Sequence, residues 1–350
     1  MRLITFSSKG TDRIGAWINN DQQVVDLAAA ALQRDGVAAP AYVSMQALIE
    51  AGEAQWDHAR RLIEVAPQEA VLNSSDCPLR APLPRPAQLR DFLSFPEHVR
   101  GCRATLGEWT IAAAAEPSRK RADLETSGFF NVPAGYYDFP VYYTCNRMAV
   151  LGPEDEVQWP AFSQFIDYEL EWAAVIGKAG SQIARSRARE HIFGYTVFND
   201  WSARDEQMKV MGGAVNLGPG TGKDFANSLG PCIVTADEIA DPYALRMTAR
   251  VNGELRSDAS TSGMHYRFEE LIEFLTRGHA VYPGEVLGSG TAGGGCGLET
   301  RLVMSDGDVV ELEVERIGRL RNRVRAPQVN ASQAGALADR MLAAMTRAIK

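Results

Sequence analysis

The most informative pattern of polar and apolar positions lies between residues 166 and 176. Apolar and aromatic residues occupy one set of alternate positions, and the other set opens with Asp167, Glu169 and Glu171. A period of two predicts a β-strand whose odd-numbered side chains point to one face. Beyond the three acids the same face becomes apolar, so we expect it to enter the interior of the protein.

Carboxylates that are stacked on a partly buried face repel one another and are poorly solvated, so they usually share a proton or a cation. A hard divalent cation such as Mg²⁺ or Ca²⁺ suits ligands that are all oxygen. The alternative is a solvated strand face with ordinary surface acids. The spacing of the residues leaves both interpretations open.

Residues 1–76 have the alternation and turn signals of a small α+β unit with no evident chemistry. Prolines recur through residues 77–88, which predicts a stiff extended linker and a domain boundary. A main domain is expected at 89–325, followed by an amphipathic C-terminal helix at 326–350. In the first unit we expect strands at 3–6, 13–18 and 23–27, and helices at 26–34 and 45–65.

The main domain alternates short strands and turns with few long helices, which predicts an α+β fold that is mainly β. A helix near 186–193 precedes a strand at 194–198, and another helix is expected at about 268–277. The strand content disfavours a barrel of eight βα units. Gly222 and Lys223 do not form a phosphate loop, because the other positions of the Walker pattern do not match.

Composition and charge exclude some classes of partner and suggest where the protein is found. The chain has 350 residues and a net charge of -8, which argues against a surface for nucleic acid or anionic membranes. It lacks a secretory signal and any run of about 18 apolar residues, so we expect a cytoplasmic protein. The five cysteines are scattered and never form a CxxC pair, which favours reduced thiols over disulfides or zinc.

Several motifs, taken together and in order, resemble the fumarylacetoacetate hydrolase family over roughly residues 89–324. They are Asp91 followed by His98, Glu169-Leu170-Glu171, His191-Ile192-Phe193-Gly194 ahead of Asn199-Asp200-Trp201-Ser202-Ala203-Arg204-Asp205, Gly222-Lys223-Asp224-Phe225, Pro283-Gly284-Glu285, Ser289-Gly290-Thr291, and Glu299.

The resemblance implies a mixed β-sandwich-like roll with a small N-terminal α+β domain, usually assembled as a homodimer. It also implies a divalent metal ion, Mg²⁺ or Ca²⁺ with Mn²⁺ as a further candidate. The ligands that it implies are Asp91, Glu169, Glu171 and Asp200.

The same resemblance implies a metal-dependent hydrolase that cleaves a C–C bond in an acylpyruvate or related 1,3-diketo acid, as in aromatic catabolism. His98, oriented by Glu299, would activate a water molecule. Three further residues, Lys223, Arg204 and Gln207, match positions that contact the intermediate, and Tyr143 and Thr291 match positions that contact substrate. For two of these residues a purely structural role is the alternative: Arg204 would only pair with Asp205, and Thr291 would only close a turn.

Two departures put fumarylacetoacetate itself in doubt. Leu93 stands where the hydrolase of tyrosine breakdown carries a tyrosine, and the loop from Gln207 to Lys223 is longer. Decarboxylation of a 2-oxo diacid, or isomerisation or hydration on the same scaffold, is therefore the alternative reaction. A metal-stabilised binder of small oxo acids without catalysis is a third hypothesis.

Overall fold

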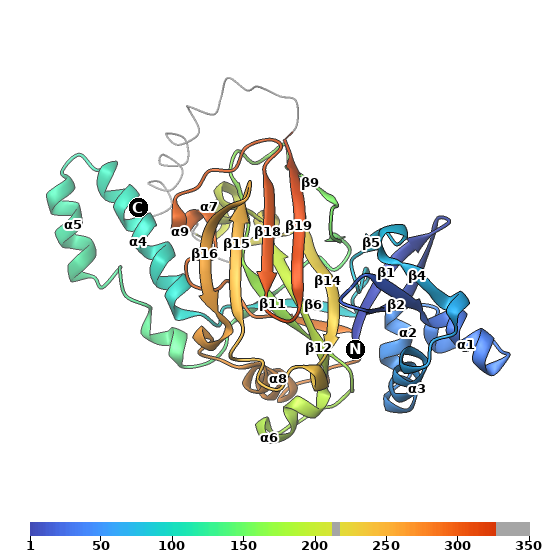
Figure 1. The fold of residues 1–350 in the computed structure, drawn as a ribbon. Helices are drawn as coiled ribbons and strands as arrows, with labels where there is room; N and C mark the ends of the chain where they lie inside the picture. Colours follow the sequence, from blue (N-terminus) through green and yellow to red (C-terminus); the bar gives the residue numbers. More distant parts are fainter. Residues whose placement is uncertain (212–217, 327–350) are drawn as a thin grey trace.

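The computed structural model describes residues 1–211 and 218–326. Two β-sheets lie against each other at the centre, with a helical hairpin on one side and the N-terminal helices on the other (Figure 1). The predicted C-terminal helix at 326–350 lies outside the described residues apart from Ala326, and so does part of the long loop after Gln207.

The larger sheet contains the strands that carry most of the acids. Its order is β4-β3-β2-β1-β14-β12-β11-β17-β6-β7, with β5 added beside β1 and β8 beside β14. Every residue of β11 and β12 is buried, because both faces of these central strands are covered. The strands are β1 (Arg2–Ser8), β2 (Thr11–Ile18), β3 (Gln23–Asp26), β4 (Val71–Asn73), β5 (Leu79–Arg80), β6 (Gln88–Phe92), β7 (Tyr142–Thr144), β8 (Val150–Leu151), β11 (Glu171–Ile176), β12 (Ile192–Asp200), β14 (Asn227–Thr235) and β17 (Glu285–Gly288).

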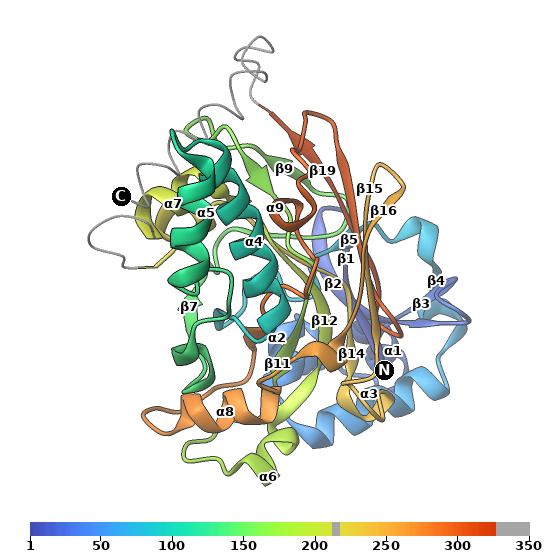
Figure 2. The same ribbon diagram turned by 90° about the vertical axis from the view of Figure 1, so that its left-hand side faces the viewer.

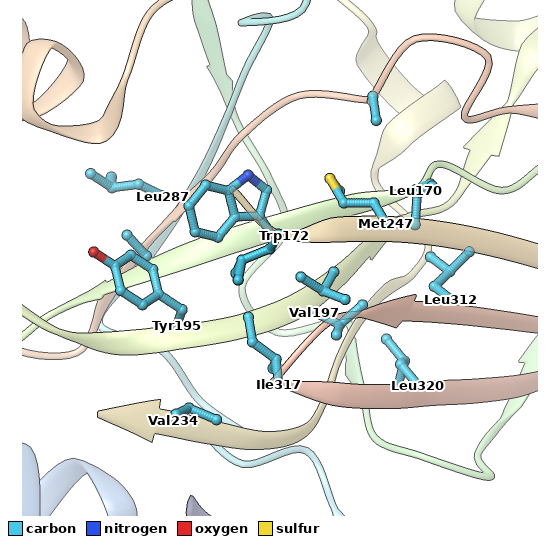
Figure 3. Close-up of a cluster of buried hydrophobic side chains, with 14 of the residues drawn as sticks. Leu170, Trp172, Tyr195, Val197, Val234, Met247, Leu287, Leu312, Ile317 and Leu320 are labelled. Carbon is cyan, nitrogen blue, oxygen red and sulfur yellow. The ribbon is translucent and has the colours of Figure 1, made fainter. Parts of the chain in front are cut away.

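A second sheet, in the order β16-β15-β18-β19-β9, packs on one face of the first. Trp172 and Val197 of the large sheet lie opposite Met247, Leu312 and Leu320 of the second one, and all five side chains are buried (Figure 3). This apolar layer fixes the two sheets relative to each other. The remaining strands are β9 (Glu156–Gln158), β15 (Arg246–Val251), β16 (Glu254–Ser260), β18 (Val309–Val314) and β19 (Gly318–Arg325), with β10 (Ile166–Asp167) and β13 (Ser202–Ala203) forming a separate pair.

The helices flank these sheets. α4 and α5 form the hairpin that crosses in front of the large sheet in Figure 2, with α7 and α9 beside them. α1, α2 and α3 pack on the N-terminal strands. The helices are α1 (Leu27–Asp35), α2 (Met45–Glu50), α3 (Glu53–Glu64), α4 (Pro96–Ala112), α5 (Pro117–Thr126), α6 (Arg185–Ala188), α7 (Arg204–Met211), α8 (Phe268–Thr276) and α9 (Gly297–Thr300).

The N-terminal strands continue the large sheet across the expected domain boundary. β1 pairs antiparallel with β14, with Leu3 opposite Ile233. Leu3 and Ile233 also share a buried cluster with Val175 of β11 and Val286 of β17. The sheet is therefore continuous, while the division into separate domains remains a prediction.

Three of the expected elements differ from the structure. The helix expected at 45–65 is two helices, because Gly52 between them adopts a φ of 77°. The helix near 186–193 ends at Ala188, and its last residues already belong to β12. The acidic strand at 166–176 is interrupted after Asp167 and resumes at Glu171.

The expected α+β class with mixed sheets is confirmed, since parallel pairs such as β6 with β17 occur among mostly antiparallel ones. In the part of the chain that the structure describes, no helix combines the length and apolar character needed to cross a bilayer.

The shared sheet predicts that the main domain is unstable alone. Removal of residues 1–76 would leave β14 with an unpaired edge and would expose the apolar surface around Ile233. We expect the truncated chain to aggregate or to melt at a clearly lower temperature in thermal unfolding. Leu32→Ala, which removes a half-exposed side chain from α1, should leave the full-length melting temperature unchanged. A truncated chain as stable as the full one would contradict this.

Candidate functional site

Three strands of the large sheet bring distant acids together. Asp91 lies on β6, Glu171 begins β11 and Asp200 ends β12. β17 separates β6 from β11, and a Cβ atom at its Gly288 would lie 2.5 Å from Asp91 Oδ1. Glycine at this position therefore lets the carboxylates approach. Oxygens of these three acids and of Glu169 all lie within 4.8 Å of one another, and all four residues are buried.

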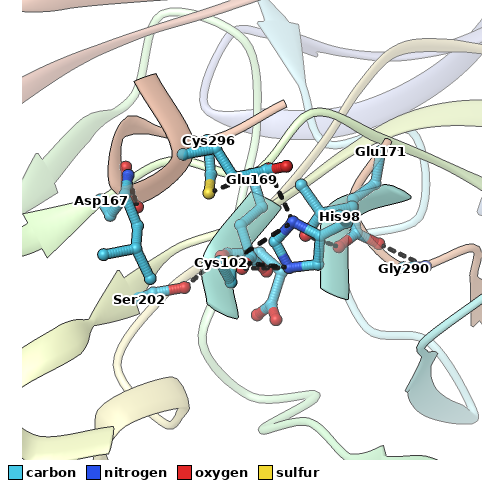
Figure 4. A network of polar contacts seen from close by, with 12 residues as sticks. His98, Cys102, Asp167, Glu169, Glu171, Ser202, Gly290 and Cys296 are labelled. Carbon is cyan, nitrogen blue, oxygen red and sulfur yellow. Dashed lines mark hydrogen bonds and ion pairs between the residues drawn. The ribbon is translucent and has the colours of Figure 1, made fainter. Parts of the chain in front are cut away.

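Backbone and hydroxyl donors fix the orientation of these acids. The Gly290 amide donates to Asp91 Oδ1 at 3.1 Å and to Glu171 Oε2 at 3.0 Å (Figure 4). Thr291 Oγ1 donates to Glu171 Oε1 at 3.3 Å, and the Tyr143 hydroxyl donates to Asp200. The two positions implied to contact substrate are therefore beside the acids, and Thr291 does more than close a turn.

The interruption of the acidic strand places Glu169 in this cluster. Asn199 Oδ1 accepts a hydrogen bond from the Glu169 amide at 2.9 Å, and the Leu170 amide donates to the Gly295 carbonyl oxygen at 2.9 Å. These contacts replace the regular ladder that a continuous strand would make. Asp167, Glu169 and Glu171 are all buried, so the alternative of a solvated acidic face is wrong.

Two cations face the acids. Lys223, which ends the 3₁₀ turn η6 (Gly220–Lys223), donates to Glu169 and to Asp200. Arg204, at the start of α7, places Nη1 at 2.8 Å from Glu169 Oε1 and at 3.1 Å from Gln207 Oε1. These two basic side chains compensate only part of the negative charge of four carboxylates.

The acids consequently differ in how readily they ionise. Burial and the charge of Asp200 raise the pKa of Asp91 to about 8, and burial and Asp91 raise the pKa of Glu171 well above its usual range. Burial also raises the pKa of Asp200. At Glu169 burial acts in the same direction, but Lys223 and Arg204 outweigh it and lower the pKa to about 2. The positive charge of Lys223 and Arg204 is thus enough to keep Glu169 ionised, but not to stabilise all four acids in their ionised form.

The residues present fit a hard divalent cation. Their donors are all carboxylate oxygens, which Mg²⁺, Ca²⁺ and Mn²⁺ prefer. Asp200 Oδ1 is buried and has no hydrogen-bond partner among the described residues, so one oxygen is available to a ligand. The residues that would bind the ion are Asp91, Glu169, Glu171 and Asp200.

The expected histidine and glutamate also meet. His98 on α4 and Glu299 on α9 lie 2.7 Å apart, from Nδ1 to Oε2, and both side chains are nearly buried. A Cβ atom at Gly101 of α4 would lie 2.5 Å from Glu299 Oε1, so glycine there permits the contact. The other ring nitrogen, Nε2, lies 4.0 Å from Glu169 Oε1. His98 and Glu299, called the dyad from here on, therefore lie beside the acid cluster, with His98 Nε2 toward it.

The proton state of His98 depends on this partner. Burial disfavours the imidazolium, but Glu299 and Cys296 outweigh burial and raise the pKa of His98 well above its usual value. A histidine whose charged form is stabilised in this way can donate a proton as well as accept one.

Sequence reasoning gave no role to Asp167, the first acid of the pattern. Its oxygens accept hydrogen bonds from Arg204 Nε at 2.9 Å and from the amides of Gly297 and Leu298 at 2.7 and 3.0 Å. It thereby orients Arg204 and fixes the start of α9, which carries Glu299. The alternation indicated its burial, whereas its partners are up to 131 residues away in the chain.

The alternative in which Arg204 pairs only with Asp205 is wrong. Asp205 instead accepts hydrogen bonds from Ser163 Oγ at 2.6 Å and from the Gln164 amide at 2.9 Å. Arg204 is buried against Asp167, which leaves its guanidinium directed at the acids rather than at solvent.

Comparison with known proteins identifies relatives of this chain. Residues 93–325 match the family model described as "Fumarylacetoacetate (FAA) hydrolase C-terminal". The mitochondrial oxaloacetate tautomerase FAHD2B of Bos taurus is 32% identical over 283 residues, which cover 80% of this chain and 79% of the relative. The oxaloacetate tautomerase YisK of Bacillus subtilis (strain 168) is 30% identical over 275 residues, 76% of this chain and 81% of the relative.

Among solved structures, the fumarylacetoacetate hydrolase EaFAH from the psychrophilic Exiguobacterium antarcticum is similar with a TM-score of 0.68. The two chains are 25% identical, and the match covers 93% of this chain and 100% of the other. The expected mixed β fold of this family is confirmed by this similarity.

The acid cluster predicts that divalent cations stabilise the protein. A cation present at about 100 times its Kd would add about 2.7 kcal/mol to the free energy of unfolding, visible as a higher melting temperature with Mg²⁺ or Mn²⁺. Asp200→Asn should abolish most of this shift, because it removes a charged ligand. Asp258→Asn, on the exposed surface of β16, should keep it. A shift that is the same in both variants would place the ion elsewhere.

Proposed function

The chain belongs to the fumarylacetoacetate hydrolase family, and we propose that it is a metal-dependent enzyme that interconverts the keto and enol forms of a small 2-oxo diacid. Relatives named as oxaloacetate tautomerases in a mammal and in a bacterium support this choice of reaction. The observation that carries it is the position of His98, between Glu299 at 2.7 Å and the acid cluster, where Glu169 is 4.0 Å away.

We propose Mg²⁺ as the ion, with Mn²⁺ and Ca²⁺ as alternatives, among the four acids. When bound there, such a cation would draw charge from the carbonyl oxygen of a chelating 2-oxo acid and so favour its enolate. The chain itself adds Lys223 and Arg204, whose charged groups already face Glu169. Both would donate hydrogen bonds to the same developing negative charge.

The proton transfer is assigned to His98 Nε2. In the keto-to-enol direction, the neutral imidazole would take a proton from the carbon next to the carbonyl, and the oxygen would be protonated from solvent. In the reverse direction, the imidazolium would return a proton to that carbon. Glu299 accepts a hydrogen bond from Nδ1 in the imidazolium, and stabilises its charge in both directions. Because the carbon–carbon and carbon–oxygen bonds change only in order and none of them is broken, no positioned water is required.

This function predicts a specific loss in a histidine variant. With Mg²⁺ present, we expect the protein to accelerate the ketonisation of enol-oxaloacetate. The rate is measured as the decrease in the ultraviolet absorbance of the enol. His98→Ala should lower kcat by about 10²- to 10⁴-fold, the usual contribution of general acid–base catalysis. It should leave the cation-induced rise in melting temperature intact, because His98 is not among the acids.

His58→Ala is the matched control, since His58 lies on α3 in the N-terminal unit and contacts Tyr42 and Asp35. Its rate should equal that of the unmodified protein. Full activity of His98→Ala would contradict the proposed role of His98 as the acid–base group, but it would not contradict the proposed metal site.

Hydrolysis of an acylpyruvate or related 1,3-diketo acid is the second candidate. The same dyad favours it, because a histidine oriented by a carboxylate also activates water, and a solved relative is named as a fumarylacetoacetate hydrolase. Leu93, on the segment between β6 and α4, remains the departure that argues against fumarylacetoacetate itself. A role in aromatic catabolism and assembly as a homodimer remain predictions.

A substrate panel in D₂O separates the two candidates. For the tautomerase we expect deuterium at C3 of oxaloacetate, seen by NMR, without enzyme-dependent cleavage of its carbon chain. For the hydrolase we expect a short acylpyruvate to yield pyruvate and a carboxylic acid. Enzyme-dependent release of CO₂ from oxaloacetate would instead indicate the decarboxylase. His98→Ala and protein-free Mg²⁺ are the controls for each reaction.

A further inference from the structure

A second cluster of candidate metal ligands lies beside the first. It consists of His98 and Cys102 from α4 and of Cys296 and Glu299 from the start of α9. One ligand atom of each residue lies within 4.8 Å of those of the other three. His98 and Cys102 are four residues apart, so both side chains lie on the same face of α4.

The distances within this cluster are those of a compact site. Cys102 Sγ lies 3.7 Å from the ring nitrogens of His98, and Cys296 Sγ lies 3.3 Å from Glu299 Oε2 (Figure 4). His98 Nδ1 and Glu299 Oε2 are 2.7 Å apart. The four groups thus surround one small volume at the contact between α4 and α9, and Cys296 is fully buried.

The chemistry of this set differs from that of the four acids. Two sulfurs, one imidazole nitrogen and one carboxylate oxygen form a soft, four-ligand donor set that suits Zn²⁺, whereas Mg²⁺ and Ca²⁺ avoid sulfur. We propose that His98, Cys102, Cys296 and Glu299 bind Zn²⁺ or a similar soft divalent cation, at a site separate from the acid cluster, and that this binding inhibits the enzyme.

Inhibition follows from the shared residues and rests on the proposed function. As metal ligands, His98 and Glu299 can no longer exchange a proton or bond to each other. Binding replaces the hydrogen bond between them and releases to solvent the two thiol protons and, where His98 is an imidazolium, the proton on the ring nitrogen that binds the cation. The soft cation would therefore inhibit by occupying His98 and Glu299, and not by displacing the ion that chelates the substrate.

The surroundings can accommodate the charge of such a complex. Two thiolates and one carboxylate around a divalent cation leave one net negative charge. Arg204 is close enough to respond to it: burial lowers the pKa of Arg204, but Asp167 and Glu169, and after them Cys296 and Cys102, raise it well above its usual value. In the structure the Arg204 guanidinium lies 2.8 Å from Asp167, which also accepts a hydrogen bond from the amide of Gly297, the residue after Cys296.

The test uses Co²⁺ as a spectroscopic substitute for Zn²⁺, added to the full-length protein in saturating Mg²⁺. Coordination by thiolates would produce a sulfur-to-cobalt charge-transfer band in the near ultraviolet, and addition of Zn²⁺ would remove it. Asp200→Asn should keep this band, since it affects only the acid cluster. Cys102→Ala should abolish or strongly weaken it while retaining the Mg²⁺-induced thermal shift. Cys77→Ala, which changes a buried cysteine at the start of the segment 77–88, should behave like the unmodified protein.

Activity provides a second readout. Micromolar Zn²⁺ should inhibit ketonisation by the unmodified protein in saturating Mg²⁺. Cys102→Ala should keep the basal rate and need at least about tenfold more Zn²⁺ for the same inhibition, because the loss of a ligand weakens a metal site by that factor or more. If no ketonisation is found at all, the proposed function fails, and the cobalt spectrum still decides the site.

Absence of a thiolate band in the unmodified protein, or an equal band in Cys102→Ala, would overturn the proposed site. Inhibition by Zn²⁺ that is unchanged in Cys102→Ala but relieved by raising the Mg²⁺ concentration would mean that Zn²⁺ acts by displacing the hard cation, and would also overturn it.

Discussion

The repulsion among four buried carboxylates is the constraint on which the rest of this structure depends. Each buried acid loses several kcal/mol of solvation relative to water, and Lys223 and Arg204 compensate only part of the combined charge. The surrounding chain is built to permit this crowding. Gly288 leaves room for Asp91, and the Gly290 amide donates to two of the acids at once. Such an arrangement is costly for stability and useful for binding a cation.

The dyad of His98 and Glu299 depends on the same region without belonging to the acid cluster. His98 arrives on a helix that follows β6, and Glu299 arrives on a short helix more than two hundred residues later. Asp167 connects Arg204 with the helix that carries Glu299, because it accepts hydrogen bonds from both Arg204 and the amides at the start of α9. A substitution at Asp167 would therefore disturb Arg204 and Glu299 together, although Asp167 is not one of the four clustered acids.

The position of the dyad between hard and soft ligands gives it two competing uses. Toward Glu169 it faces a site of oxygen donors, and toward Cys102 and Cys296 it faces sulfur. An imidazole is acceptable to either kind of metal ion, so only the protein environment determines whether it acts as an acid–base group or as a ligand. If both proposed sites bind their ions, the proximity of the two clusters would make activity depend on the kind of divalent cation that is present.

Local patterns in the sequence determined the α+β class and the N-terminal strands and favoured an interior position for the acidic face, while the family motifs predicted the residues that the structure brings together at the site. They did not determine the interruption that places Glu169 among the ligands, because pairing with a segment more than a hundred residues away replaces the ladder there. Only the tertiary structure joined the N-terminal strands to the large sheet through β1 and β14, and only it placed Cys102 beside Cys296. Periodicity reports which side of an element is buried, whereas contacts between distant segments depend on how the elements pack.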